Sequence, residues 1–241
     1  MSADNYGVLN PIRKWNKCND CGLVYAHNIP SSSALSDYYK FHSEALINKG
    51  VNAAISQVGN IERYITYSNN RLDKIESLIS KKGKLLDIGA GIGTFVKVAR
   101  DRGWDVYGIE SSQNDYKYAK EYWDIDLIDI DFSDFSSNQS YDIITMFEVI
   151  EHFVRPWDAL EKCSKLLSNG GILLVATLFR DSDYVKSLSP EQDFWWNEPS
   201  HLSYMDTECL IKRAKLYGFE CIKIVDSEQG AGMLEIFFRK Q

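Results

Sequence analysis

Short apolar runs alternate with amphipathic segments through the middle of this sequence, from residue 61 to residue 178. Runs such as residues 141–147 and 171–178 are apolar almost throughout, which is typical of strands buried on both faces of a sheet. Residues 61–79 instead repeat apolar side chains mainly every three or four positions, and this spacing indicates an amphipathic helix. Strands that alternate with helices predict an α/β fold with helices on both faces of a mostly parallel sheet.

The last part of the chain departs from this alternation. Residues 206–218 predict a helix that ends at Gly218, and residues 219–240 predict two strands joined by a short glycine-containing turn. Because no helix separates them, these two strands must run antiparallel. The other strands are expected at residues 84–89, 104–110, 125–130, 141–147 and 171–178. The other helices are expected at residues 61–79, 94–103, 112–123 and 157–167.

The first 50 residues have a different character. They contain the pair Cys18 and Cys21 and a turn-rich stretch at residues 28–39, but no apolar run long enough to predict a strand with conviction. We therefore expect an N-terminal extension at residues 1–50, outside the central sheet, and one main domain at residues 51–241.

Composition narrows the function classes. The chain has 241 residues, 44% of them hydrophobic, and its net charge of −7 comes with no basic block, which argues against a nucleic-acid partner. No apolar run approaches the roughly 20 residues that a membrane span requires, and no signal peptide is recognised, so we expect a cytoplasmic protein. Five scattered cysteines predict reduced thiols rather than a disulfide framework.

The strand expected at residues 84–89 leads into a glycine-rich turn. Asp87 is followed by Gly89, Gly91 and Gly93, and such a turn lets a ligand approach the backbone at the start of the next helix. Asp87 can accept a hydrogen bond from a cationic amine. Glu110 ends the next strand and can hold both hydroxyls of a ribose. The third glycine comes one residue early for the dinucleotide fingerprint, which argues against a nicotinamide oxidoreductase.

These pieces resemble the class I S-adenosylmethionine-dependent methyltransferases, in the group that includes sugar and quinone methyltransferases. The resemblance covers roughly residues 60–240 and rests on LLDIGAGIGTF, VYGIESS, DIDF, YDIITMFEVIEHFVRPWDAL and LLSNGGILLVAT, in that order. It implies a Rossmann-like, seven-stranded, mostly parallel sheet with a reversed C-terminal strand. It also implies S-adenosylmethionine as cofactor and makes residues 51–241 a class I methyltransferase domain.

The same resemblance assigns cofactor contacts. Asp87, Gly89 and Gly91 would surround the methionine part, and Glu110 would bind the ribose. The remaining contacts that it implies are Asp131 and Phe132 beside the adenine, and Met146 and Phe147 against the methionyl side.

The segment that follows residue 147 carries the candidate catalytic residues. Glu148, Glu151 and His152 can project near one another if the chain turns into a short helix there. His152, with Glu151, would act as a general base on the acceptor. Alternatively, all three side chains would bind a divalent cation, as in the quinone methyltransferases that the chain resembles. A third hypothesis is that Glu151 and His152 only hydrogen-bond the backbone and shape the loop.

Acceptor contacts and the N-terminal cysteines complete the predictions. His201, Trp195 and Tyr39 are candidate substrate contacts, the last through a lid over the acceptor site. A structural zinc needs four ligands, and the extension, which resembles half of a zinc ribbon, offers only Cys18 and Cys21. We expect this extension to be a metal-free relic of such a zinc ribbon. A zinc ribbon that binds nucleic acid would need four ligands and a basic face, and both are missing from the sequence.

The predicted function is therefore methyl transfer to a small-molecule acceptor. The relic favours a sugar, nucleotide-sugar or surface-polysaccharide precursor. The alternative is O-methylation of a polyprenylated phenol, a quinone precursor, with metal assistance. No basic amphipathic helix is apparent that would reach a membrane-borne substrate. Whether the chain forms a homodimer is left open.

Overall fold

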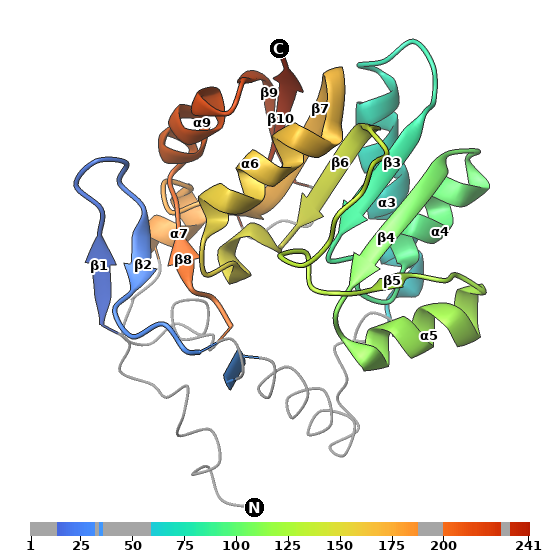
Figure 1. Ribbon diagram of the computed structural model, residues 1–241, viewed down its shortest axis with the longest axis horizontal. Helices are drawn as coiled ribbons and strands as arrows, with labels where there is room; N and C mark the ends of the chain where they lie inside the picture. The colour runs from blue at the N-terminus through green and yellow to red at the C-terminus, as the bar shows by residue number, and fades with distance from the viewer. Residues whose placement is uncertain (1–13, 32–33, 36–58, 188–199, 228–231) are drawn as a thin grey trace, which may run out of the picture.

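One sheet of seven strands organises the computed structural model, which describes residues 14–31, 34–35, 59–187, 200–227 and 232–241 (Figure 1). The strand order is β5-β4-β3-β6-β7-β10-β9. The strands of this sheet span Lys84–Ile88 (β3), Asp105–Glu110 (β4), Ile128–Asp129 (β5), Tyr141–Phe147 (β6), Leu167–Leu178 (β7), Phe219–Asp226 (β9) and Met233–Lys240 (β10). β3, β4, β5, β6 and β7 pair in parallel, whereas β10 runs antiparallel to both β7 and β9. The predicted fold class and the reversed C-terminal strand are thus confirmed.

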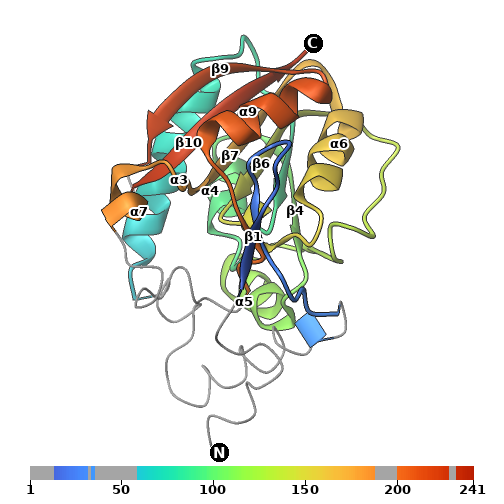
Figure 2. The same ribbon diagram turned by 90° about the vertical axis from the view of Figure 1, so that its left-hand side faces the viewer.

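Helices cover both faces of this sheet, and each face has its own core (Figures 1 and 2). α6 and α9 pack on one face, and α3 and α4 pack on the other. The helices span Ile61–Glu76 (α3), Thr94–Asp101 (α4), Gln113–Trp123 (α5), Pro156–Leu166 (α6), Asp183–Ser187 (α7) and Thr207–Leu216 (α9), with a short 3-10 helix, η2, at Ile150–His152. Among the described residues, none of these helices combines the length and apolar character that crossing a membrane requires.

Successive residues of the central strands serve opposite cores. On β3, Leu85 joins the core under α3 and α4, while Leu86 joins the core under α6 and α9. Phe237 and Phe238 of β10 divide in the same way. This alternation follows from the two-residue period of a strand, and it explains why these segments are apolar almost throughout.

The sheet brings the loops after its parallel strands to one edge. β3 lies between β4 and β6, so the connection after β3 and the connection after β6 leave toward opposite sides. Ligands of open α/β sheets bind outside the carboxyl ends of strands at such a reversal. The loops after Ile88 and Phe147 therefore mark the position of the candidate site.

A second, smaller sheet contains strands that the sequence did not predict. Trp15–Lys17 (β1) and Val24–Ala26 (β2) form an antiparallel hairpin, and β2 pairs with Ser203–Tyr204 (β8). Each strand has only two or three residues, which is too short for a visible hydrophobic period. The hairpin lies outside the central sheet. The proposed boundary between residues 50 and 51 falls outside the described residues and stays a prediction.

A buried cluster of charges ties α3 to β10. Arg71 Nε and Lys74 Nζ each lie 3.0 Å from a carboxylate oxygen of Glu235, whose side chain is 1% exposed. The Ser227 hydroxyl lies 3.2 Å from the same carboxylate. A buried carboxylate needs such partners, because losing its water is otherwise costly. Glu235 therefore fixes α3 against the sheet.

We predict that Glu235→Ala lowers the free energy of unfolding by about 3–5 kcal/mol, since it removes the carboxylate that two buried or half-buried cations share. Urea denaturation monitored by circular dichroism measures the change in the free energy of unfolding. If Glu235→Ala does not fold, the same measurement is made on Glu235→Gln. Glu161→Ala is the matched control, because the Lys165–Glu161 pair is exposed and such pairs contribute at most about 1 kcal/mol. Equal losses in Glu235→Ala and the control would contradict the prediction.

Candidate functional site

The glycine-rich turn after β3 has a backbone that side chains would obstruct. Gly89, Gly91 and Gly93 have φ of 70°, 53° and 78°, in the left-handed region that favours glycine. A Cβ on Gly89 would lie 2.4 Å from Cγ2 of Val149, whereas a Cβ on Gly91 would meet no atom within 4 Å. The turn therefore packs closely against the loop after β6 and leaves open space beside Gly91, where a ligand can approach the backbone.

Asp87 lies at the carboxyl end of β3, directly before this turn. Its side chain is buried, and its Oδ1 accepts a hydrogen bond of 2.6 Å from the Thr145 hydroxyl. Asp87 and Thr145 are neighbours in the register of β3 and β6. Burial raises the pKa of Asp87 to about 7, although the hydrogen bond from Thr145 and the charge of Arg71 oppose this rise.

Glu110 stands at the end of β4 and is fixed against the glycine-rich turn. Its carboxylate accepts the backbone N–H of Gly91 at 2.8 Å and the backbone N–H of Ser112 at 2.7 Å. Burial raises the pKa of Glu110 to about 7, and the nearby charge of Asp115 adds to the effect. Each carboxylate oxygen still has a second lone pair with which to accept a ribose hydroxyl.

The glycine-rich turn and the two acids fit the predicted cofactor. S-Adenosylmethionine carries a sulfonium and an amino group, and a cation favours the ionised form of carboxylates that burial has made hard to ionise. The open space at Gly91, beside the carboxylate of Glu110, is where the chain could accommodate it.

The residues predicted beside the adenine belong to one short loop after β5. Asp131 is exposed and its Oδ1 accepts the backbone N–H of Ser133 at 2.7 Å. Phe132 is 4% exposed and packs against Phe153. Lys162 of α6 donates to the carbonyl oxygens of Phe132 at 2.6 Å and Ser133 at 2.9 Å, and its ammonium lies 4.9 Å from the centre of the Phe132 ring. Lys162, which the sequence analysis missed, therefore holds this loop against α6.

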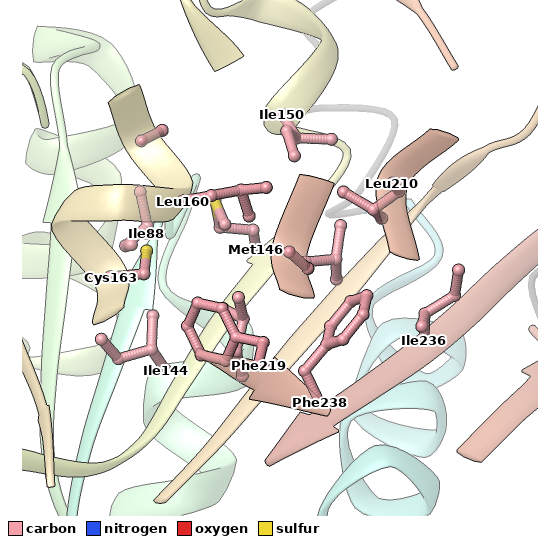
Figure 3. Close-up of a cluster of buried hydrophobic side chains, with 14 of the residues drawn as sticks. Ile88, Ile144, Met146, Ile150, Leu160, Cys163, Leu210, Phe219, Ile236 and Phe238 are labelled. Carbon is pink, nitrogen blue, oxygen red and sulfur yellow. The ribbon is translucent and has the colours of Figure 1, made fainter. Parts of the chain in front are cut away.

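Met146 and Phe147 at the end of β6 face different surroundings. The Met146 side chain is completely buried in the core under α6 and α9 (Figure 3). Its side chain therefore belongs to the core, and only its backbone remains a candidate for a cofactor contact. Phe147 is half-buried, with its ring against Phe95 and the Arg71 guanidinium 3.9 Å from the ring centre. Arg71 was also missed, since nothing in the sequence relates its helix to the end of β6.

Glu151 lies in η2 with its carboxylate turned into the protein. The residue is 4% exposed, and Oε1 accepts a hydrogen bond of 2.7 Å from the Thr177 hydroxyl. Oε2 is buried and has no hydrogen-bond partner among the described residues. Burial raises the pKa of Glu151 to about 7. A buried carboxylate oxygen without a partner is costly, so a ligand that supplied a positive charge or a donor there would be stabilised.

Two histidines stand beside Glu151. The ring centres of His152 and His201 are 5.0 Å apart. His152 Nδ1 lies 3.0 Å from the carbonyl oxygen of Ser200. A carbonyl only accepts, so Nδ1 carries the proton, and a neutral His152 has its lone pair on Nε2. The Leu202 N–H donates to the Glu151 carbonyl at 2.8 Å, and this bond brings His201 alongside η2.

One ligand atom from each of Glu151, His152 and His201 lies within 4.8 Å of the others. A carboxylate and two imidazoles at this separation suit a divalent transition-metal or zinc ion, and the same imidazoles suit proton transfer. Glu148 is not a member of this set. It is exposed, with a left-handed φ of 56°. The predicted set of metal ligands therefore differs from this set in one member: it contained Glu148, whereas the structure groups His201 with Glu151 and His152. The sequence analysis had placed His201 among the acceptor contacts.

The remaining predicted acceptor contacts, Trp195 and Tyr39, lie outside the described residues and stay predictions. The sequence analysis also missed Thr177, the hydrogen-bond partner of Glu151. Thr177 lies in the apolar run at residues 171–178, whose pattern predicts a strand and indicates no site residue.

Comparisons with known proteins identify the family and the fold. The family described as "Methyltransferase domain" matches residues 62–224. A "Ubiquinone biosynthesis O-methyltransferase" of Caulobacter vibrioides is 35% identical over 103 residues, which cover 40% of this chain and 41% of that protein. A protein of the same name from Saccharophagus degradans is 27% identical over 154 residues, 56% of this chain and 64% of that one. The chain thus aligns with less than two thirds of these relatives' lengths.

Solved structures share the fold. An S-adenosylmethionine-dependent methyltransferase from Clostridium acetobutylicum superposes with a TM-score of 0.58 at 13% identity, covering 85% of this chain and 98% of that one. The plantazolicin methyltransferase BpumL, solved with a monoazolic desmethylPZN analog and SAH, gives a TM-score of 0.60 at 19% identity, covering 87% and 97%. The predicted family, fold and cofactor, S-adenosylmethionine, are confirmed. The chain belongs to the methyltransferase domain family and has the fold of the class I S-adenosylmethionine-dependent methyltransferases.

Proposed function

We propose that this chain transfers a methyl group from S-adenosylmethionine to a hydroxyl oxygen of a small aromatic acceptor, with a divalent cation at Glu151, His152 and His201. The observation that carries the proposal is this set of three ligand atoms within 4.8 Å, next to the end of β6. When bound, the cofactor would supply a methyl group on a sulfonium. The chain's task is to position the two molecules and to prepare the hydroxyl.

Preparing the hydroxyl requires loss of its proton. A phenol has a pKa near 10, and a bound cation lowers the pKa of an oxygen that it touches. The buried Glu151 carboxylate supplies the charge that would hold the cation, and Thr177 fixes its orientation. His152 presents the Nε2 lone pair because Ser200 holds Nδ1–H. His201 completes the set from the segment before β8.

The names of the relatives support an oxygen of a quinone precursor as the acceptor. This acceptor replaces the sugar, which the resemblance of the N-terminal extension favoured, as our first choice. Because the chain aligns with only part of those relatives, the acceptor remains a proposal and both classes belong in the assay. A metal-free reaction in which His152 alone takes the proton is the alternative mechanism.

The ionised carboxylates at the ends of β3 and β4 are proposed to contact the cationic cofactor, Asp87 at its methionine part and Glu110 at its ribose hydroxyls. Asp87 and Glu110 have pKa values raised to about 7, so each is about half protonated at that pH. Pairing with a cation requires the ionised form, so binding releases protons, and affinity rises with pH up to the pKa.

We predict that affinity for S-adenosylmethionine rises roughly tenfold between pH 5.5 and 7 for each carboxylate that must ionise. Isothermal titration calorimetry in buffers of different ionisation enthalpy measures both the affinity and the protons released. S-Adenosylhomocysteine, which lacks the sulfonium charge, should release fewer protons, and Glu110→Gln should bind more weakly with a shallower pH dependence. An affinity that is flat across this range would remove the two carboxylates from the cofactor contacts.

A second prediction concerns the loop predicted to hold the adenine. Lys162→Met removes two charged hydrogen bonds, to the carbonyls of Phe132 and Ser133. We expect cofactor affinity to fall about tenfold or more, since such bonds contribute about 1.5–3 kcal/mol, while kcat at saturation changes little. Lys165→Met, at an exposed position on the same helix, is the control. A loss of thermal stability with unchanged affinity would mean that Lys162 serves only the fold.

The cation site has its own test. We predict that Mn²⁺ binding, measured by electron paramagnetic resonance, weakens at least about 10- to 100-fold in His201→Gln, since losing even a group that only supports a metal ligand costs that much. Glu148→Gln should weaken binding far less, because Glu148 is outside the set. The opposite order would restore the ligand set that the sequence suggested.

Transfer of an isotopically labelled methyl group into catechols and into nucleotide sugars, with and without chelator, then tests the function. Label in the catechol that is lost with chelator supports the proposal. If methyl transfer continues in the presence of chelator but is lost in His152→Ala, the proposed role of the cation would be overturned. His152 would then be the general base. Label in the nucleotide sugar would overturn the choice of acceptor.

A further inference from the structure

Three of the five cysteines lie together where the turn of the β1–β2 hairpin meets α9. Cys18 and Cys21 belong to that turn, and Cys209 comes from α9, almost the whole chain away. We propose that Cys18 and Cys21 form a dithiol site that reacts with a low-molecular-weight disulfide and closes to an internal disulfide.

The turn holds the two sulfur atoms next to each other. The Cys18 N–H donates to the Leu23 carbonyl at 2.8 Å, and the Gly22 N–H donates to the Cys18 carbonyl at 2.9 Å. Gly22 has φ of 81°, so this tight return of the chain favours glycine. The thiols of Cys18 and Cys21 are neighbours in this turn, and a disulfide between them would span only two intervening residues.

Groups from α9 surround the Cys21 sulfur. Cys209 and the Arg213 guanidinium both lie against the Cys21 thiol. Arg213 also bonds the Asp20 carboxylate at 2.6 Å, which fixes the guanidinium beside the turn. Arg213 and Cys209 thus hold the Cys21 sulfur between the turn and α9.

Exposure and hydrogen bonding together distinguish Cys18 from the other thiols. Cys18 and Cys221 are half-buried, while Cys21, Cys209 and Cys163 are buried; burial raises the pKa of Cys221. The backbone N–H groups of Cys21 and Asp20 donate to the Cys18 sulfur and lower its pKa. Burial raises the pKa of Cys209 to about 12 and raises that of Cys163 as well. Cys18 is therefore the thiol that meets the oxidant, and Cys209 stays reduced.

The reaction balances as two exchanges with an oxidised low-molecular-weight disulfide. The Cys18 thiolate attacks one sulfur of that disulfide, whose S–S bond breaks and releases one thiolate. Cys21 then loses its proton, attacks the Cys18 sulfur and expels the second thiolate. The two protein thiols are oxidised, the disulfide is reduced to two thiols, and excess thiol reverses the change.

The site has a direct backbone connection to the candidate catalytic residues. The Ala26 N–H donates to the Leu202 carbonyl at 3.0 Å, and the Leu202 N–H donates to the Glu151 carbonyl at 2.8 Å. The hairpin that contains Cys18 and Cys21 therefore supports the segment that contains His201 through a backbone hydrogen bond.

The test equilibrates the full chain with glutathione and glutathione disulfide at a series of ratios and measures free thiols by differential alkylation and mass spectrometry. We expect Cys18 and Cys21 to lose alkylation together, with a loss of two hydrogens in the peptide that contains both. Cys18 should react at least about tenfold faster than Cys163 and Cys209. Added dithiothreitol should restore both thiols.

Two variants make the result specific. Cys18→Ser, checked for its fold by circular dichroism, should leave Cys21 reduced under the same conditions, and Cys221→Ser should leave the Cys18–Cys21 disulfide unchanged. A stable glutathione adduct on Cys18 with Cys21 still alkylatable would overturn the proposal. Protection of both thiols that a chelator removes would also overturn it, in favour of a thiolate-bound metal.

Discussion

Parallel pairing of β3 with β4 and β6 is the constraint on which the rest of this structure depends. Parallel strands need a covering on both faces, and α3, α4, α6 and α9 supply it. The same pairing brings the ends of β3, β4 and β6 to one edge, where Asp87, Glu110 and the loop with η2 meet. A single-residue change of register would exchange the two cores and turn Asp87 away from Thr145.

Three carboxylates at this edge share one physical property. Burial raises the pKa values of Asp87, Glu110 and Glu151 to about 7. Desolvated acids of this kind destabilise the protein when they ionise, and they bind cations most strongly when the cation replaces the lost water. Asp87 and Glu110 lie where the cofactor is proposed to bind, and Glu151 lies where a divalent ion is proposed to bind. Burial of carboxylates thus favours cation binding at both the proposed cofactor site and the proposed metal site.

The N-terminal hairpin takes part in this arrangement instead of standing apart from it. Its turn is held by Arg213 and Cys209 of α9, and β2 pairs with β8 (Figures 1 and 2). Through Leu202 it supports both His201 and the carbonyl of Glu151. The proposed thiol chemistry and the proposed acceptor site therefore lie on neighbouring parts of one small sheet.

The sequence by itself determined the strands of the central sheet, its reversed last strand and the glycine-rich turn after Asp87, because these features are local. Apolar runs, helical spacing and the glycines after Asp87 act through nearby residues, so their patterns are visible along the chain. Only the tertiary structure decided the composition of the candidate catalytic cluster and of the thiol cluster. His201 joins Glu151 through a backbone bond of Leu202, and Cys209 reaches Cys21 through the packing of α9 on the hairpin. Contacts between such distant residues depend on how elements pack, and packing leaves no periodic signal in the sequence.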